Sequence, residues 1–223
     1  MTRIVQLCLM AALTLSGGPA QAGAWMRETS SWFVSTTTRL VWPKDVPAAK
    51  ARADGWTYHT IYAEYGVSER LTLGVDIGVP REGEPKVIVF MRKPIRQPDT
   101  GTQIAWDLGV GTIAGDTVIR PGLGIGRGLE NGWLNADAMA EISVGEAGMA
   151  FKLDLTYGIN LARDRKIVLQ VQSSKTAEDP FSATFAPSVI FPLTDSLSAE
   201  VGGSYGFHED ETMGLLLGLW ADF

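Results

Sequence analysis

The chain has 223 residues, of which 45% are hydrophobic, and its formal net charge is −6. This acidic balance argues against nucleic-acid binding, which needs a basic face, and the hydrophobic content argues against disorder. Beyond the first two dozen residues, no apolar run approaches the roughly 18 residues that a transmembrane helix requires, so a helical membrane bundle is excluded.

The first 22 residues have the pattern of a cleavable export signal. Arg3 supplies the positive charge, residues 4–15 are largely apolar, and Ala20-Gln21-Ala22 matches the small-x-small cleavage pattern. We expect cleavage after Ala22. Cleavage removes Cys8, the only cysteine, so the exported chain has no disulfide.

Long stretches of the remaining chain alternate between apolar and small polar residues. In residues 71–79, Leu, Val and Ile fall on one face while Thr, Gly and Asp fall on the other, and residues 149–161 and 197–207 repeat this pattern. A period of two predicts strands, and these are longer than the usual 5–6 residues. The continuous apolar face is suited to lipid, and strands in lipid must close into a barrel because an open sheet edge leaves backbone groups unsatisfied.

Short polar turns recur at a nearly constant spacing, marked by Glu69, Asp99, Asn131, Asp164 and Asp195. Each interval fits two strands, one turn and one outer loop. We therefore predict an all-β fold, a closed antiparallel transmembrane β-barrel with up-and-down meander order and about 12 strands, with 10 or 14 as alternatives. The predicted strands are 31–41, 56–66, 71–80, 87–95, 102–113, 117–127, 132–144, 149–162, 166–175, 181–192, 196–207 and 212–223. The outer loop at 42–55 is the only long one.

The last strand places Leu217, Leu219 and Phe223 on one face and ends the sequence on Phe. Together with the export signal and the strand pattern, this ending resembles the assembly signal of proteobacterial outer-membrane β-barrel proteins. The resemblance implies a Gram-negative outer-membrane location, recognition of the last strand by the barrel-assembly machinery, and contact with outer-membrane lipid and lipopolysaccharide. The pattern in residues 65–74 is also similar to small uncharacterised transporter-like barrels, and it suggests no particular substrate.

These features divide the chain into an export signal at 1–22, a periplasmic N-terminal segment at 23–30 and a barrel at 31–223. The sequence offers no long inward loop as a plug, and only the segment 23–30 is placed to fold into the barrel. The seven Trp residues fall mostly near strand ends, which predicts anchoring at the two membrane interfaces.

The alternation also predicts which charged side chains line the lumen. They are Arg39, Glu64, Asp76, Arg92, Asp107, Arg120, Asp137, Glu141, Lys152, Asp154, Glu200 and Asp222. Eight carboxylates against four cations favour a water-filled path that prefers cations. The alternative is a narrow lumen filled by paired charges, since an unpaired buried charge is costly.

Two functions of different classes follow from this pattern. The first is a small pore or channel for ions or small solutes, and the second is a closed barrel with a structural or interaction role, for example through the loop at 42–55. A lipid hydrolase at the rim is a third candidate. Resemblance to a twelve-strand outer-membrane phospholipase would imply a catalytic His and Ser on the lipid-facing surface near the rim, and His59 is the residue that would fill the His role. No matching serine motif accompanies His59, so we assign no catalytic residue.

No cofactor-binding motif or metal-ligand spacing is recognisable in the sequence, and we expect no cofactor. His208 and the acidic residues 209–211 are an alternative divalent-cation site, since carboxylate oxygens suit Ca²⁺ and Mg²⁺. A solvated loop is the simpler interpretation of this cluster.

Overall fold

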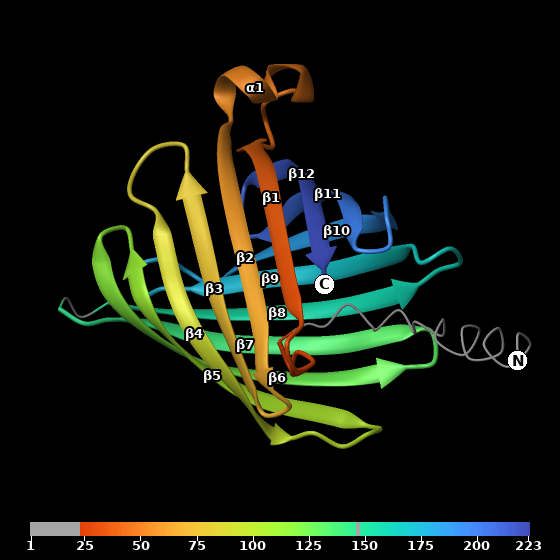
Figure 1. The fold of residues 1–223 in the computed structure, drawn as a ribbon. Helices are drawn as coiled ribbons and strands as arrows, with labels where there is room; N and C mark the ends of the chain where they lie inside the picture. The colour runs from red at the N-terminus through yellow and green to blue at the C-terminus, as the bar shows by residue number, and fades with distance from the viewer. Residues whose placement is uncertain (1–22, 146–147) are drawn as a thin grey trace, which may run out of the picture.

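The computed structural model describes residues 23–145 and 148–223, so the predicted export signal with Cys8 lies outside the described residues, as does part of the predicted loop at 145–148. Twelve antiparallel strands form a closed ring in chain order (Figure 1), which confirms the predicted meander and strand number. The strands are β1 (Trp32–Pro43), β2 (Trp56–Ser68), β3 (Leu71–Pro80), β4 (Lys86–Arg96), β5 (Thr102–Ile113), β6 (Asp116–Leu129), β7 (Gly132–Ser143), β8 (Met149–Asn160), β9 (Lys166–Lys175), β10 (Ser182–Pro192), β11 (Leu197–His208) and β12 (Thr212–Asp222).

The ring closes where the first strand meets the last. β1 and β12 pair without interruption from Phe33 opposite Asp222 to Pro43 opposite Thr212. At the seam, the backbone N–H of Trp32 donates to the carbonyl of Phe223 at 2.6 Å, and the N–H of Phe223 donates back at 3.0 Å. The seam therefore satisfies the backbone groups that an open edge would leave exposed to lipid.

The two ends of the barrel differ. At the turn end, which holds Trp32 and the C-terminus, short connections join the strands; the opposite, loop end carries the connection between β1 and β2, with η1 (Ala48–Lys50) and α1 (Ala51–Asp54). In Figure 1 this helical loop stands above β1 and β2. Among the described residues, no helix is long and apolar enough to cross a membrane.

Burial is inverted relative to an ordinary globular core. Large apolar side chains point away from the ring, such as Leu73, Val89 and Leu217, the last of which is 61% exposed. Charged side chains such as Glu64 and Arg92 point inward and are only 2% and 5% exposed. Large exposed apolar surfaces and buried charges are both unusual in soluble proteins. Here they alternate along every strand around the ring, which is the pattern of a barrel with a lipid-facing outer surface and a polar interior.

The N-terminal segment Gly23–Arg27 crosses the interior. A Cβ added at Gly124 of β6 would lie 2.8 Å from the carbonyl carbon of Gly23 and 2.9 Å from the nitrogen of Ala24, so this close approach requires glycine. Four residues later, the Arg27 N–H donates to Thr72 Oγ1 of β3 at 3.0 Å. Arg27 also pairs with Asp222 of β12 at 3.2 Å, and β12 lies six places from β6 in the ring of twelve, so the segment forms a strap across the lumen.

An apolar cluster lies inside the barrel toward the turn end. Trp133, Val168 and Ile190 are buried there, and Trp25 and Trp220 pack against them. The prediction that the tryptophans anchor the membrane interfaces is therefore wrong for these three, because the strand alternation turns Trp133 and Trp220 inward and Trp25 belongs to the strap. The exposed residues Trp32 and Trp56 remain suited to that role.

Candidate functional site: the charged lumen

The predicted lumen residues lie on inward-facing strand positions, and the structure divides them into two groups. Glu64, Asp76, Glu141 and Asp222 form ion pairs. In the described part of the chain Asp107, Asp137, Asp154 and Glu200 have no ion pair within 4.0 Å. The roles of all these residues in ion passage or in a charge network remain a prediction.

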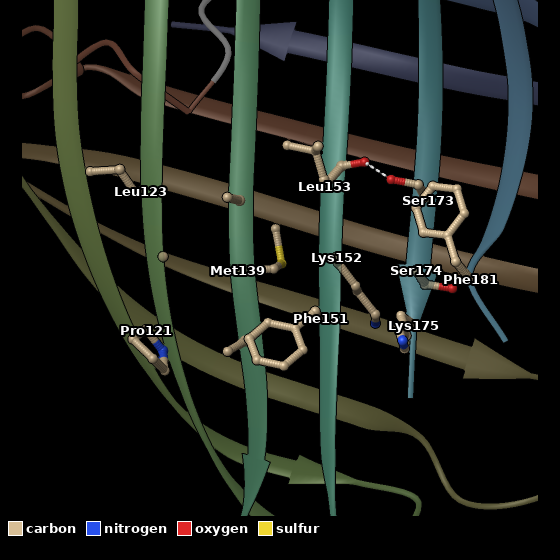
Figure 2. Close-up of a pocket in the computed structure, with 13 residues that line it drawn as sticks. Pro121, Leu123, Met139, Phe151, Lys152, Leu153, Ser173, Ser174, Lys175 and Phe181 are labelled. Carbon is tan, nitrogen blue, oxygen red and sulfur yellow. Dashed lines mark hydrogen bonds between the residues drawn. The ribbon is translucent and has the colours of Figure 1, made fainter. Parts of the chain in front are cut away.

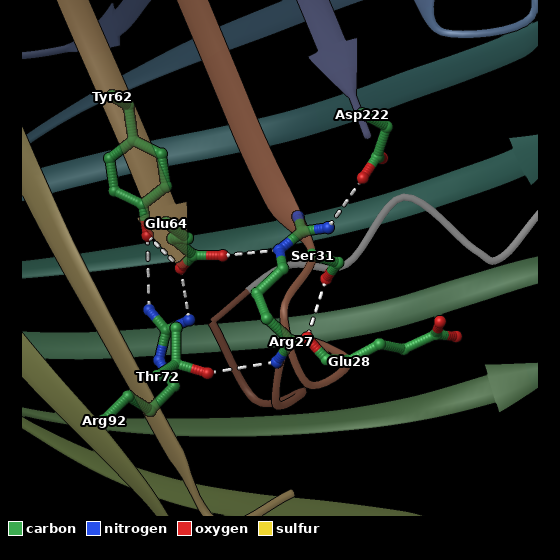
Figure 3. A network of polar contacts seen from close by, with 8 residues as sticks. All are labelled: Arg27, Glu28, Ser31, Tyr62, Glu64, Thr72, Arg92 and Asp222. Carbon is green, nitrogen blue, oxygen red and sulfur yellow. Dashed lines mark hydrogen bonds and ion pairs between the residues drawn. The ribbon is translucent and has the colours of Figure 1, made fainter. Parts of the chain in front are cut away.

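The first ion-pair network is centred on Glu64 of β2 (Figure 3). Its carboxylate accepts from Arg27 Nε at 2.9 Å and from Arg92 Nη1 at 2.5 Å, and Tyr62 also donates to it. Arg27 reaches on to Asp222 of β12 at 3.2 Å. Charge-assisted bonds on both sides of one buried carboxylate tie the strap to β2, β4 and β12.

A second network joins three strands of the wall, β3, β4 and β6. Asp76 of β3 accepts from Lys86 Nζ of β4 at 2.8 Å and from Arg120 Nη1 of β6 at 2.5 Å. One carboxylate therefore binds two cations. The guanidinium groups of Arg120 and of Arg92, the latter from the first network, both lie within 6 Å of the centre of the Phe90 ring.

The opposite wall carries a third ion pair and two hydrogen-bonded glutamines, Gln170 and Gln172. Lys152 of β8 pairs with Glu141 of β7 at 2.7 Å. Arg39 of β1 donates to Gln172 of β9 at 3.0 Å. β1 and β9 are four places apart in the ring, so the Arg39 side chain reaches over the lumen rather than along the wall.

Two of the unpaired carboxylates are direct partners in the strand register. Asp137 of β7 stands directly opposite Asp154 of β8. Asp107 of β5 stands opposite Arg92, but the Arg92 guanidinium is engaged by Glu64 and the Asp107 carboxylate leans over Gly122. Glu200 differs from these three, because Ser188 donates to it at 2.6 Å and the Trp220 indole at 2.9 Å.

The sequence analysis missed two cations that the structure places in the lumen, Arg27 and Lys86. The predicted strands 71–80 and 87–95 leave Lys86 in the connection between them, although it shares the parity of Ile88 and begins β4. Strand alternation extended by one residue would have found it. Arg27 lies before the first strand, and no local signal shows that its segment folds back.

The outer wall of the barrel carries a groove of about 510 Å³ over β6 to β9 (Figure 2). It is lined by outward apolar side chains, among them Leu123, Phe151 and Leu153, and it exists because β7 presents small residues there, including Ala138 and Ala140. This surface faces the lipid in a membrane barrel, where acyl chains cover such a groove. It therefore does not compete with the lumen as the candidate site.

His59 lies on the outward face of β2, as its strand parity predicts. Its Nδ1 lies 2.9 Å from Thr38 Oγ1 of β1. A hydrolytic site of this kind needs a nucleophile hydrogen-bonded to a base, and a third group, usually an acid, that orients the base. Among the described residues, no carboxylate accepts a hydrogen bond from His59.

The loop-end cluster at His208 is arranged for structure rather than metal binding. His208 packs against the Phe181 ring with centroids 5.7 Å apart, and Glu211 pairs with Lys44. Partial burial opposes ionisation of Asp210, but hydrogen bonds from Thr184 and Thr212 outweigh it and hold the pKa of this carboxyl below its usual value. Among residues 23–145 and 148–223, no three His, Cys, Asp or Glu side chains form a metal-ligand group.

Comparison with known proteins gives no match to a family model and none to a curated protein. Solved structures of similar fold include the KdgM porin in complex with disordered oligogalacturonate (TM-score 0.63, 8% identity, covering 86% of this chain and 99% of that one). They also include the NanC porin (TM-score 0.64, 8% identity, 83% and 98%) and the COG4313 outer membrane channel from Pseudomonas putida F1 (TM-score 0.58, 8% identity, 89% and 97%).

These similarities concern the fold. The chain is a closed twelve-strand antiparallel β-barrel, and its fold is similar to those of the KdgM and NanC porins and of the COG4313 outer membrane channel. The sequence identities of 8% carry no information about which solute such a barrel passes.

Proposed function

We propose that the protein is a small non-enzymatic pore of the bacterial outer membrane, which passes ions or small solutes and prefers cations. The fold similarity to porins and to an outer-membrane channel supports the pore role and the location. The observation that carries the cation preference is that Asp107, Asp137 and Asp154 face the lumen without an ion-pair partner among the described residues. Fixed negative charge in a narrow path raises the local cation concentration.

The test is single-channel recording of the refolded mature chain in a planar bilayer under a KCl gradient. We expect discrete current steps and a reversal potential of cation-selective sign. In Asp107→Asn, the K⁺ to Cl⁻ permeability ratio should fall several-fold, because one unit charge acts on an ion at ~4 Å with about 1 kcal/mol even at the dielectric constant of water.

The matched control removes one positive and one negative charge, so the net charge of the lumen stays the same. Glu141→Gln combined with Lys152→Met deletes an ion pair of 2.7 Å, so it leaves the net lumen charge unchanged and should leave the permeability ratio near that of the native protein. A barrel that folds, as judged by heat-modifiable gel mobility, but passes no current would refute the pore and favour a closed structural or interaction barrel. A pore with unchanged selectivity in Asp107→Asn would refute the cation preference alone.

A further inference from the structure

Asp137 and Asp154 form a pair of like charges, and neither carboxylate has an ion pair within 4.0 Å among the described residues. Their Cα positions are direct partners in the β7–β8 ladder, and both side chains point inward, so their Cβ atoms lie about 4.5–5.5 Å apart. Like charges at directly opposed positions destabilise a sheet. The cation whose charge acts most on Asp137 is Arg92, and that guanidinium is already bound to Glu64. For Asp154 it is Arg39, whose guanidinium donates to Gln172, the register partner of Asp154. Asp137 is therefore the member of the pair without a cation of its own.

A second observation shows what lies against this pair. The backbone of Gly23 is seated on the Asp137 carboxylate so closely that a Cβ on Gly23 would overlap it. Since the nitrogen and a Cβ are bonded to the same Cα, the Gly23 nitrogen lies within about 5 Å of the carboxylate. Asn135, which is 4% exposed, donates its Nδ2 to Asp137, and its Oδ1 is buried without a hydrogen-bond partner.

Gly23 is also the residue that the predicted cleavage after Ala22 makes the first of the mature chain. Cleavage converts its peptide nitrogen, which carries no charge, into an ammonium group with three donors. Such a group supplies a positive charge beside Asp137, the carboxylate on which Gly23 is seated.

We propose that the α-ammonium of Gly23, created by removal of the export signal, is the counter-ion of Asp137 and locks the strap across the lumen. The strap is then held at both ends, by Gly23 at β7 and by Arg27 at Glu64 and Thr72. The lock forms only after processing, because the uncleaved chain carries a neutral peptide group at this position. This inference rests on cleavage after Ala22 and is independent of whether the barrel conducts.

The geometry also explains two glycines. A side chain at Gly23 would strike Asp137, and one at Gly124 would strike the backbone of Gly23 and Ala24. Gly128, farther along β6, has open space where its Cβ would be. An alanine at position 124 should therefore displace the strap without changing any charge, whereas an alanine at position 128 should leave it in place.

The experiment measures the reactivity of the terminal amine. The exported protein is purified from outer membranes, its first residue is determined by mass spectrometry, and the folded barrel is treated with a small acetylating reagent at pH 7.5. Acetylation of Gly23 is followed by peptide mass spectrometry, with lysine acetylation as the internal reference. Only the uncharged amine reacts, so an ion pair that raises the amine pKa by one unit slows acetylation about tenfold.

We expect Asp137→Asn and Gly124→Ala to accelerate acetylation of Gly23 at least tenfold, and Gly128→Ala and the loop-end charge variant Glu211→Gln to leave it at the native rate. Insertion of Ser-Ser after Ala22 moves the amine by up to about 7 Å and should also make it reactive. A mature chain that begins at a residue other than Gly23, or acetylation in Asp137→Asn that is as slow as in the native protein, would overturn the proposal. No current is measured, so failure here is distinct from failure of the pore function.

Discussion

The buried carboxylate of Glu64 should contribute more to stability than any exposed ion pair of this protein. Its side chain is 3% exposed, and the side chains of its partners Arg27 and Arg92 are each 6% exposed. In Glu64→Gln the amide replaces one charge while both guanidinium groups stay buried. Removing one partner of a buried pair costs about 3–5 kcal/mol, mostly because the remaining charge is uncompensated.

The matched control is Glu211→Gln in the loop-end pair with Lys44. That pair is 3.4 Å long and its Glu211 side chain is 87% exposed, so the loss should lie within about 1 kcal/mol. Salt provides a second distinction. The exposed pair should weaken between about 0.05 and 0.5 M salt, whereas the buried network should be almost insensitive to it.

The assay is urea unfolding of the barrel inserted in lipid vesicles, followed by tryptophan fluorescence. The midpoint and slope give the free energy of unfolding of each variant. A loss in Glu64→Gln below about 1 kcal/mol, or no larger than that in Glu211→Gln, would refute the reasoning that the strap network is a buried, desolvated contact.

Two further predictions concern the loop end and the barrel seam. Because the pKa of Asp210 is lowered in the folded protein, its contribution to stability is present above the ordinary aspartate pKa of 3.8 and is lost as pH falls through the lowered value. The melting temperature of Asp210→Asn should thus lie below that of the native protein at pH 5, and the gap should close toward pH 2. For the predicted assembly signal, Phe223→Asp should reduce the amount of barrel assembled in cells several-fold, whereas refolding in detergent should be nearly unchanged, because the 67% exposed Phe223 side chain makes the seam through its backbone. Equal loss in both assays would assign Phe223 to folding rather than to recognition by the assembly machinery.

The strand pattern by itself determined the class of fold. Alternation over residues such as 71–79 assigns each side chain to one of two faces, and a pleated strand leaves no third choice. The regular turn spacing then predicted the number of strands, because each hairpin uses a similar length of chain to span the same membrane thickness. Both signals are local, so they can be read from the sequence without knowing which residues contact each other in the folded barrel.

Which lumen charges are paired was decided only by the tertiary structure. Parity predicts that Glu64 and Asp107 both point inward, but not that Arg92, which stands opposite Asp107 in the ladder, binds Glu64 instead. That choice depends on side-chain reach across the sheet and on Arg27, which arrives from a segment without strand periodicity. The strap is likewise a long-range feature, because Gly23 meets Asp137 and Gly124 only once the barrel has closed around it. The alternation of the sequence therefore specified the wall, whereas contacts between residues far apart in the chain determined what fills the lumen.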